Sequence, residues 1–197
     1  MTAATTRLFS FNAILLAIAL TGCSSSQPVE RGDLVTLRGN PVTLQGEGVD
    51  VGDAAPDAVL VGQDMKEQKL SDYRGKTVIL SVVPSLDTGV CSKQTQRFNE
   101  AAADLKDNVV VLTVSKDLPF AQKRWCGAHN VDKVVTLSDY KYGSFGESFC
   151  LRIKESGLLA RSIYVIDPQG KIVYEQIVPE LTTEPDYDAA LVVASGT

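Results

Sequence analysis

The chain has few of the residues that usually bind metals. Among its 197 residues there is one histidine, His129, and there are only four cysteines, which are far apart in the sequence. Because zinc sites are mostly built from closely spaced histidine and cysteine ligands, we expect no metal site. The chain also lacks a run of basic residues and has a net charge of −5, so nucleic acid is not an expected partner.

Two further patterns are missing. No glycine-rich phosphate loop occurs, and no two cysteines have the Cys-x-x-Cys spacing of thioredoxin-type redox helices. The composition is otherwise ordinary, with 44% hydrophobic and 22% charged residues. Together with the length, it predicts one globular domain with a substantial core, preceded by an N-terminal leader.

The first 22 residues differ from the rest of the chain. An apolar stretch at residues 13–20 is too short to span a bilayer but has the length of a signal-peptide core. It leads into Leu-Thr-Gly-Cys, ending at Cys23, which resembles the lipobox of bacterial lipoproteins. This resemblance implies that residues 1–22 are a signal peptide, that Cys23 is lipidated, and that residues 23–34 form a lipidated tether. We therefore expect an extracytoplasmic, membrane-anchored lipoprotein, with a plain cleaved signal or a retained anchor as alternatives.

Strand and helix patterns alternate along residues 35–197. Residues 78–83 and 109–114 are β-branched runs typical of buried strands, and helical spacing between them predicts a strand–helix–strand unit with parallel strands. The other expected elements are a hairpin at 35–44 that turns at Gly39-Asn40, strands at 58–61 and 134–137, a helix at 119–129, a hairpin with strands at 162–166 and 171–178, and a last helix that begins at Thr183–Pro185 and ends near Ala194. This order predicts an α/β chain with a thioredoxin-like fold: a central mixed sheet flanked by helices, with an N-terminal β-hairpin.

Cys91 lies between the expected strand at residues 78–83 and the helix that follows it, inside the first turn of that helix. Unpaired backbone N–H groups and the positive end of the helix dipole favour a thiolate over a thiol there. Since the thiolate is the nucleophilic form, the position suggests chemistry at Cys91; the alternative is a small buried apolar residue. Thr88, three residues earlier, has a hydroxyl suited either to hold a substrate oxygen or to cap the helix.

Pro84, Thr88 and Cys91 fit the pattern Pro-x-x-x-Thr-x-x-Cys, which resembles the active-site motif of the peroxiredoxins. Further segments resemble the bacterial thiol peroxidases, the atypical two-cysteine branch of that family, at residues 35–44, 118–127, 135–139, 158–161 and 182–188. The likeness runs from about Val35 to the C-terminus. It implies an enzyme without a cofactor that reduces hydrogen peroxide and alkyl hydroperoxides with electrons from a thioredoxin-like dithiol.

The resemblance also implies roles for individual residues. Cys91 would be the peroxidatic nucleophile and Cys126 the resolving cysteine, so that a sulfenic acid on Cys91 ends as an intramolecular Cys91–Cys126 disulfide. Thr88 and Arg161 would orient the peroxide and stabilise the developing charge. Pro84 would shield the sulfur from water.

Other interpretations remain open at this stage. A Cys91–Cys126 disulfide would also be an ordinary structural staple in a secreted protein. Cys150, whose apolar neighbours favour a buried structural thiol, is a second possible partner for Cys91. The family commonly forms homodimers, but its usual members have no lipoprotein leader. A thiol-disulfide oxidoreductase acting on protein thiols and a redox-inactive lipid-anchored binding protein are the competing functions.

Overall fold

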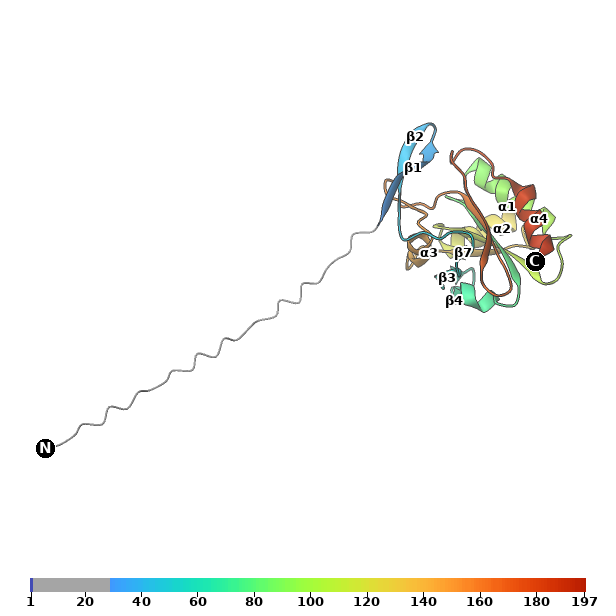
Figure 1. Cartoon of the computed structure of the whole chain (residues 1–197). Coiled ribbons are helices and arrows are strands. Elements are labelled where there is room, and N and C mark those ends of the chain that lie inside the picture. Colours follow the sequence, from blue (N-terminus) through green and yellow to red (C-terminus); the bar gives the residue numbers. More distant parts are fainter. Residues whose placement is uncertain (2–28) are drawn as a thin grey trace.

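The computed structural model describes Met1 and residues 29–197, which form a seven-stranded and a three-stranded sheet with helices packed around them (Figure 1). The expected signal peptide, Cys23 and the first part of the expected tether lie outside the described residues. In the described part of the chain, no helix is long and apolar enough to cross a membrane.

The central sheet has the strand order β10-β9-β5-β6-β7-β3-β4. Its middle strands β5 (Thr77–Val82), β6 (Val109–Ser115) and β7 (Val135–Ser138) run parallel, joined by helices α1 (Gly89–Ala101) and α2 (Pro119–His129). The antiparallel strands on either side are β9 (Ser162–Ile166), β10 (Ile172–Ile177), β3 (Val59–Gly62) and β4 (Glu67–Lys69). Because β5, β6 and β7 are parallel, the loops that follow them lie at the same edge of the sheet.

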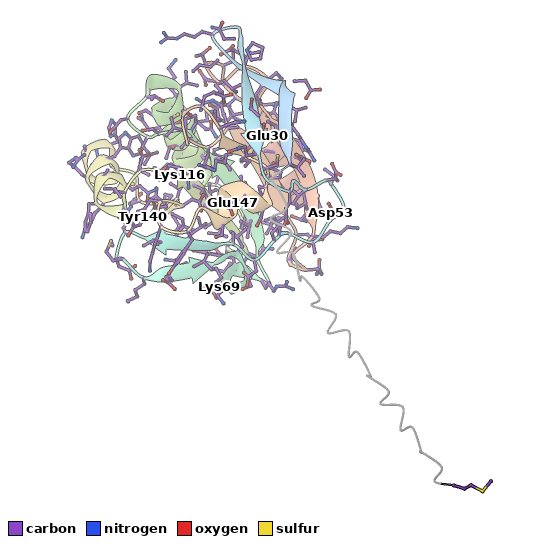
Figure 2. The ribbon with its side chains drawn as sticks, turned by 90° about the vertical axis from the view of Figure 1, so that its left-hand side faces the viewer. Glu30, Asp53, Lys69, Lys116, Tyr140 and Glu147 are labelled. Carbon is purple, nitrogen blue, oxygen red and sulfur yellow. The ribbon has the colours of Figure 1, made fainter. Side chains whose placement is uncertain are left out.

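The smaller sheet contains β1 (Glu30–Leu37), β2 (Asn40–Gln45) and β8 (Arg152–Ile153), all antiparallel. Figure 2 shows Glu30 on this hairpin and Glu147 on the short helix α3 (Ser144–Ser148) on the same side of the molecule. The remaining elements are a 3₁₀ turn η1 (Leu70–Tyr73), α3 (Ser144–Ser148) and the C-terminal helix α4 (Tyr187–Gly196).

Two apolar cores lie on opposite faces of the central sheet. Every residue of β5 is buried, and its side chains alternate between the faces. Ile79 packs with residues of α1, α2 and α4, whereas Leu80 packs with residues of the hairpin and α3. Full burial of a large apolar side chain stabilises a fold by about 1.5–3 kcal/mol. The face under α1, α2 and α4 contains both Cys91 and Cys126.

The expected thioredoxin-like fold is confirmed, with corrections at the N-terminal hairpin. Its turn residues are Arg38 and Gly39 rather than Gly39-Asn40, and both have positive φ, of 53° and 78°. Such a two-residue turn matches the twist of the strands it joins. The first strand begins at Glu30, so the expected domain boundary at residue 35 falls inside β1. Most of β1 is exposed, so its sequence does not alternate between apolar and polar residues. That alternation is the pattern from which a strand is predicted, and its absence explains why the start of β1 was placed too late.

The last helix begins later than predicted. Asp186 is its N-cap and accepts a hydrogen bond from the Ala189 N–H at 3.0 Å, so Thr183–Pro185 precede the helix. The Thr183 hydroxyl instead donates to the Glu180 carbonyl at 2.8 Å, within a turn. Four further elements have no sequence signal that predicts them, namely β4, η1, α3 and β8, and none of them exceeds five residues.

Candidate active site

The Cys91 thiol occupies the position that the sequence predicts. Cys91 is the third residue of α1, after the N-cap Thr88, and is fully buried. The strand β5 and the buried Val83 lead into the loop 84–88, which turns the chain into the helix. The Cys91 carbonyl accepts from the Thr95 hydroxyl at 3.0 Å. The sulfur therefore lies beside the unpaired N–H groups of a helix start, in the core rather than at the surface.

Arg161 is the polar neighbour of the Cys91 sulfur. It immediately precedes β9 and is only 2% exposed. Its Nη2 donates to Cys91 Sγ at 3.4 Å and to the Leu181 carbonyl at 2.9 Å, and its Nε donates to the same carbonyl at 3.1 Å. Its Nη1 donates to Gln94 Oε1 at 2.7 Å. These four bonds leave one of the five guanidinium N–H groups unused.

Gln94 is a site residue that the sequence analysis missed. It lies one helical turn after Cys91 on the buried face of α1, and its amide nitrogen donates to the Ser81 hydroxyl at 2.9 Å. Its amide oxygen accepts from Arg161, so Gln94 fixes the guanidinium against the sheet. A buried glutamine on the same helical face as Cys91 was the available signal, because polar residues rarely face a core without a partner.

Pro84, Thr88 and Arg161 line one open cavity of about 500 Å³. Its walls are mostly apolar and come from the N-terminal hairpin, from the segment between β8 and β9, and from the loop before α4; they include Leu37, Val42, Ile153, Leu158 and Leu181. The Thr88 side chain makes no capping bond, so the capping account is wrong; its hydroxyl donates to the Ser85 carbonyl at 3.1 Å.

Cys126 is held apart from this cavity. It lies in the last turn of α2 and is 6% exposed. The Gln63 amide donates to its sulfur at 3.3 Å, and the Thr136 hydroxyl lies 3.8 Å from the same atom. Burial raises the pKa of the Cys126 thiol, while the bonds to Thr136 and Gln63 oppose that rise. The sulfur is thus stabilised as a neutral thiol.

Cys150 is the third described thiol, and no disulfide joins it, Cys91 or Cys126. It is buried after α3 in the core on the opposite face of the sheet from the other two. Burial raises the pKa of Cys150. Its surroundings agree with the expectation of a structural thiol.

His129 ends α2 and interacts with the helix itself. Its ring stacks on Trp125 with centroids 4.4 Å apart, and Nδ1 lies 2.9 Å from the Trp125 carbonyl. Within the described residues, no three His, Cys, Asp or Glu side chains gather closely enough to hold a metal ion.

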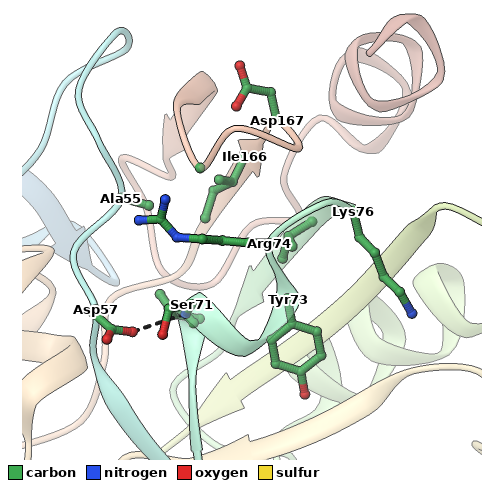
Figure 3. Close-up of a pocket in the computed structure, with 11 residues that line it drawn as sticks. Ala55, Asp57, Ser71, Tyr73, Arg74, Lys76, Ile166 and Asp167 are labelled. Atoms are coloured by element: carbon green, nitrogen blue, oxygen red, sulfur yellow. Dashed lines mark hydrogen bonds between the residues drawn. The ribbon is translucent and has the colours of Figure 1, made fainter.

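A second concavity, at the opposite end of the central strands, contains none of the expected site residues. It has a volume of about 20 Å³, which is room for a single water. Figure 3 shows Arg74 extending across it toward Ala55, and Asp57 accepting from the Ser71 N–H at 3.0 Å. This concavity is too small for a substrate.

The chain is similar in sequence to known proteins. The family model described as Redoxin matches residues 50–191. The thiol peroxidase of Bacillus subtilis is 54% identical over 160 residues, which cover 81% of this chain and 95% of that protein. The thiol peroxidase of Streptococcus pneumoniae (strain D39) is 51% identical over 161 residues, or 82% of this chain and 98% of that protein.

Solved structures give the same picture. The peroxiredoxin-like protein from Aquifex aeolicus has a TM-score of 0.78 and 40% identity, with 87% of this chain and 99% of that chain covered. The thiol peroxidase from Chromobacterium violaceum has a TM-score of 0.73 at 17% identity, covers 81% of this chain and 93% of that chain, and so supports the fold alone.

Proposed function

The chain belongs to the redoxin family and, within it, to the thiol peroxidases, which reduce peroxides at the expense of thiols; from this premise we propose that Cys91 is the sulfur that attacks the peroxide. The contact between Arg161 and Cys91 carries this proposal. No ion pair of the described residues involves Arg161, and its other acceptors are the neutral oxygens of Leu181 and Gln94. A buried charge is costly unless it is paired, so the thiolate of Cys91 is its natural counter-ion.

The first step is a nucleophilic displacement on oxygen. The Cys91 thiolate attacks one peroxide oxygen, the O–O bond breaks, and the electron pair leaves with the other oxygen as hydroxide or alkoxide, which is then protonated to water or alcohol. Cys91 becomes a sulfenic acid. The unused N–H of Arg161 and the Thr88 hydroxyl are suited to bind the peroxide oxygens and the departing negative charge. Pro84 adds no backbone donor to the cavity wall and limits the access of water.

The cavity supports alkyl hydroperoxides as substrates in addition to hydrogen peroxide. Its volume of about 500 Å³ far exceeds that of hydrogen peroxide and lies in the range of small-molecule sites. The walls contributed by Val42, Ile153 and Leu158 are apolar, so they would bury an alkyl chain while the peroxide group meets Arg161.

Resolution is assigned to Cys126. The Cys126 thiol gives up its proton as its sulfur attacks the sulfenic sulfur of Cys91, an S–S bond forms, and the hydroxyl leaves with that proton as water. Because both sulfurs are buried in their own helices, α1 and α2 must shift or fray before they meet. A thioredoxin-like dithiol would then reduce the disulfide by exchange and leave oxidised itself. Without resolution, further peroxide would oxidise Cys91 irreversibly.

We also propose that Cys23 carries a lipid anchor and that the enzyme works on an extracytoplasmic membrane surface. The support is the lipobox-like sequence after the short apolar stretch. Mass spectrometry of the mature N-terminus should find an acylated Cys23, and Cys23→Ala should release the protein from the membrane fraction; an unmodified, soluble wild type would refute the anchor. A homodimer is proposed from the family alone, and sedimentation of the mature protein tests it.

The test of the peroxidase assignment compares three cysteine variants in a peroxide-consumption assay with a dithiol reductant. Cys91→Ser should abolish turnover. Cys126→Ser should consume about one equivalent of peroxide and then fail or slow, since the first step is intact. Cys150→Ser is the matched control and should turn over like the wild type. Full activity in Cys91→Ser would overturn the assignment.

A further inference from the structure

Asp117 lies between β6 and α2, beside the loop that leads to Cys91. Its Oδ1 accepts from the Ser85 hydroxyl at 2.7 Å, and its Oδ2 accepts from the Leu86 N–H at 2.8 Å. Oδ2 also accepts from the Ser115 hydroxyl at 2.8 Å, at the last residue of β6. A single carboxylate therefore joins the loop after β5 to the end of β6.

The same network continues into the helix that carries Cys126. The Ser115 oxygen accepts from the amide of Gln122 at 3.0 Å. Gln122 is fully buried, lies one turn before Cys126 in α2, and also donates to the Leu137 carbonyl at 2.9 Å. An unbroken path of hydrogen bonds thus runs from the Cys91 loop through Asp117 to α2.

We propose that Asp117 is a positioning residue that orders the Cys91 loop and, through Ser115 and Gln122, also restrains the Cys126 helix. The inference rests on the proposed roles of the two cysteines. In the reduced protein, Asp117 holds Ser85 and Leu86, and with them the loop that presents Pro84 and Thr88 to the cavity. When the disulfide forms, α2 must leave its packed position, and the path through Asp117 opposes that movement.

The carboxylate matters to this arrangement because three donors converge on it. An asparagine side chain has one acceptor oxygen and no negative charge, and its NH₂ group could bond only after a serine hydroxyl turned from donor to acceptor. The two redox steps should respond to its loss in opposite directions. A less ordered loop slows the attack on peroxide, whereas a less firmly packed α2 speeds resolution.

The experiment uses Asp117→Asn in the full mature protein, with Asp107→Asn, a change at an exposed carboxylate, as the control. The rate of the first step is measured by trapping the sulfenic acid in a Cys126→Ser background. The rate of resolution is measured from the fluorescence of Trp125, the only tryptophan and the neighbour of Cys126, at saturating peroxide. We expect the first rate to fall about tenfold, as for one lost hydrogen bond to a charged group, and the second to rise several-fold.

One-sided variants, each of which breaks the network on one side of Asp117, separate these two restraints from general loosening of the fold. Ser85→Ala should slow the first step and leave resolution unchanged, because it removes only the loop contact. Gln122→Met should speed resolution and leave the first step unchanged. Urea unfolding of each variant records its stability, and these two variants decide the question if Asp117→Asn does not fold.

Three results would overturn the inference: unchanged rates in Asp117→Asn, two rates that fall together, or equal effects of the one-sided variants on both steps. If the wild-type Cys91 fails to form a sulfenic acid, the proposed function is wrong instead. The two failures are therefore distinguishable.

Discussion

Cys91 and Cys126 are buried thiols on the same face of the central sheet, yet their polar neighbours differ in charge. The Cys91 sulfur accepts from the guanidinium of Arg161, whereas the Cys126 sulfur faces the neutral side chains of Gln63 and Thr136. Burial disfavours the charged form of a thiol, and the pKa of Cys126 is accordingly raised. The comparison teaches that a buried cation, rather than exposure to water, distinguishes the proposed nucleophile.

The difference suits the two proposed steps. Attack on a peroxide needs a thiolate from the start, because the nucleophile must displace an oxygen anion. In the second step Cys126 loses its proton as its sulfur attacks, and that proton can leave with the sulfenic hydroxyl as water. The cation beside Cys91 and the neutral groups beside Cys126 thus match the order of the two proposed steps.

The largest effect is expected from removing the cation. Arg161→Met should lower the second-order rate of sulfenic acid formation by about 100- to 1000-fold, because the charge developing on the departing oxygen loses its donor. Arg161→Lys keeps the charge but not the forked geometry and should lose less. Stopped-flow kinetics measures both variants, with urea unfolding as the control. A rate within threefold of the wild type in Arg161→Met would show that the Arg161 cation does not make Cys91 the more reactive thiol.

A smaller effect is expected from adding a cation at the other thiol. Gln63→Lys places an ammonium group near Cys126 and should raise its rate of alkylation at pH 7 about tenfold in a Cys91→Ser background. Gln63→Met, of similar length and neutral, is the matched control. Because burial raises the pKa of Cys126, alkylation without the lysine should continue to increase above pH 9. Equal rates in the two variants would show that charge does not control this sulfur.

A third test concerns the wall of the cavity beside Cys91. The Glu180 carboxylate accepts from the Thr182 hydroxyl at 2.6 Å and from the N–H groups of Gly39 and Arg38 at 2.9 and 3.0 Å. These bonds, that of Thr182 most of all, hold the pKa of Glu180 well below its ordinary value. The hairpin tip is thereby fastened to the loop that contains Leu181.

The pKa of Glu180 is lower in the folded than in the unfolded chain, so the bonds to Glu180 stabilise the fold above about pH 4.5, the ordinary value of a glutamate. This stabilisation is lost as the pH falls below that value. Glu180→Gln should increase amide exchange at Arg38 and Gly39 several-fold at pH 7, after correction for intrinsic rates. The wild type should approach the variant on acidification. Indistinguishable exchange at neutral pH would contradict the role of the carboxylate.

The smallest effect is expected at the third thiol. Cys150→Ala should leave peroxide turnover unchanged and lower the free energy of unfolding by on the order of 1 kcal/mol, through a small cavity. Cys150→Ser should destabilise more, because its hydroxyl would need a partner in an apolar core. A loss of turnover in Cys150→Ala, with its stability measured alongside, would show that Cys150 also takes part in the reaction.

Long elements with local signals were predictable from the sequence. Residues 119–129 form α2 as predicted, with Pro119 at the start of the helix and Asn130 in a left-handed C-cap at φ 54°. Short elements were not predictable, since they depend on distant partners. The five-residue α3 is one example: the buried Asp139 accepts from its Phe145 and Gly146 N–H groups, both at 3.1 Å.

The site residues also divide into those with a local sequence signal and those that depend on distant partners. The position of Cys91 at a helix start follows from local patterns, but residue type alone would make Arg161 a surface partner, and only the family resemblance indicated a role beside the sulfur. Its burial and its bonds to Leu181 and Gln94 depend on the whole fold. The role of Asp117 has no local signal, because the Ser85 and Leu86 groups that it binds lie 32 and 31 positions earlier in the chain.

The contact between Cys91 and Arg161 joins residues 70 positions apart, and the hairpin is fastened to Glu180 across more than 140 positions. During synthesis the sulfur therefore emerges long before its guanidinium and before the loop that closes the cavity. A nascent or truncated chain therefore has the cysteine without its guanidinium. On the proposed mechanism, the reaction assisted by Arg161 begins only when the C-terminal quarter has folded into place.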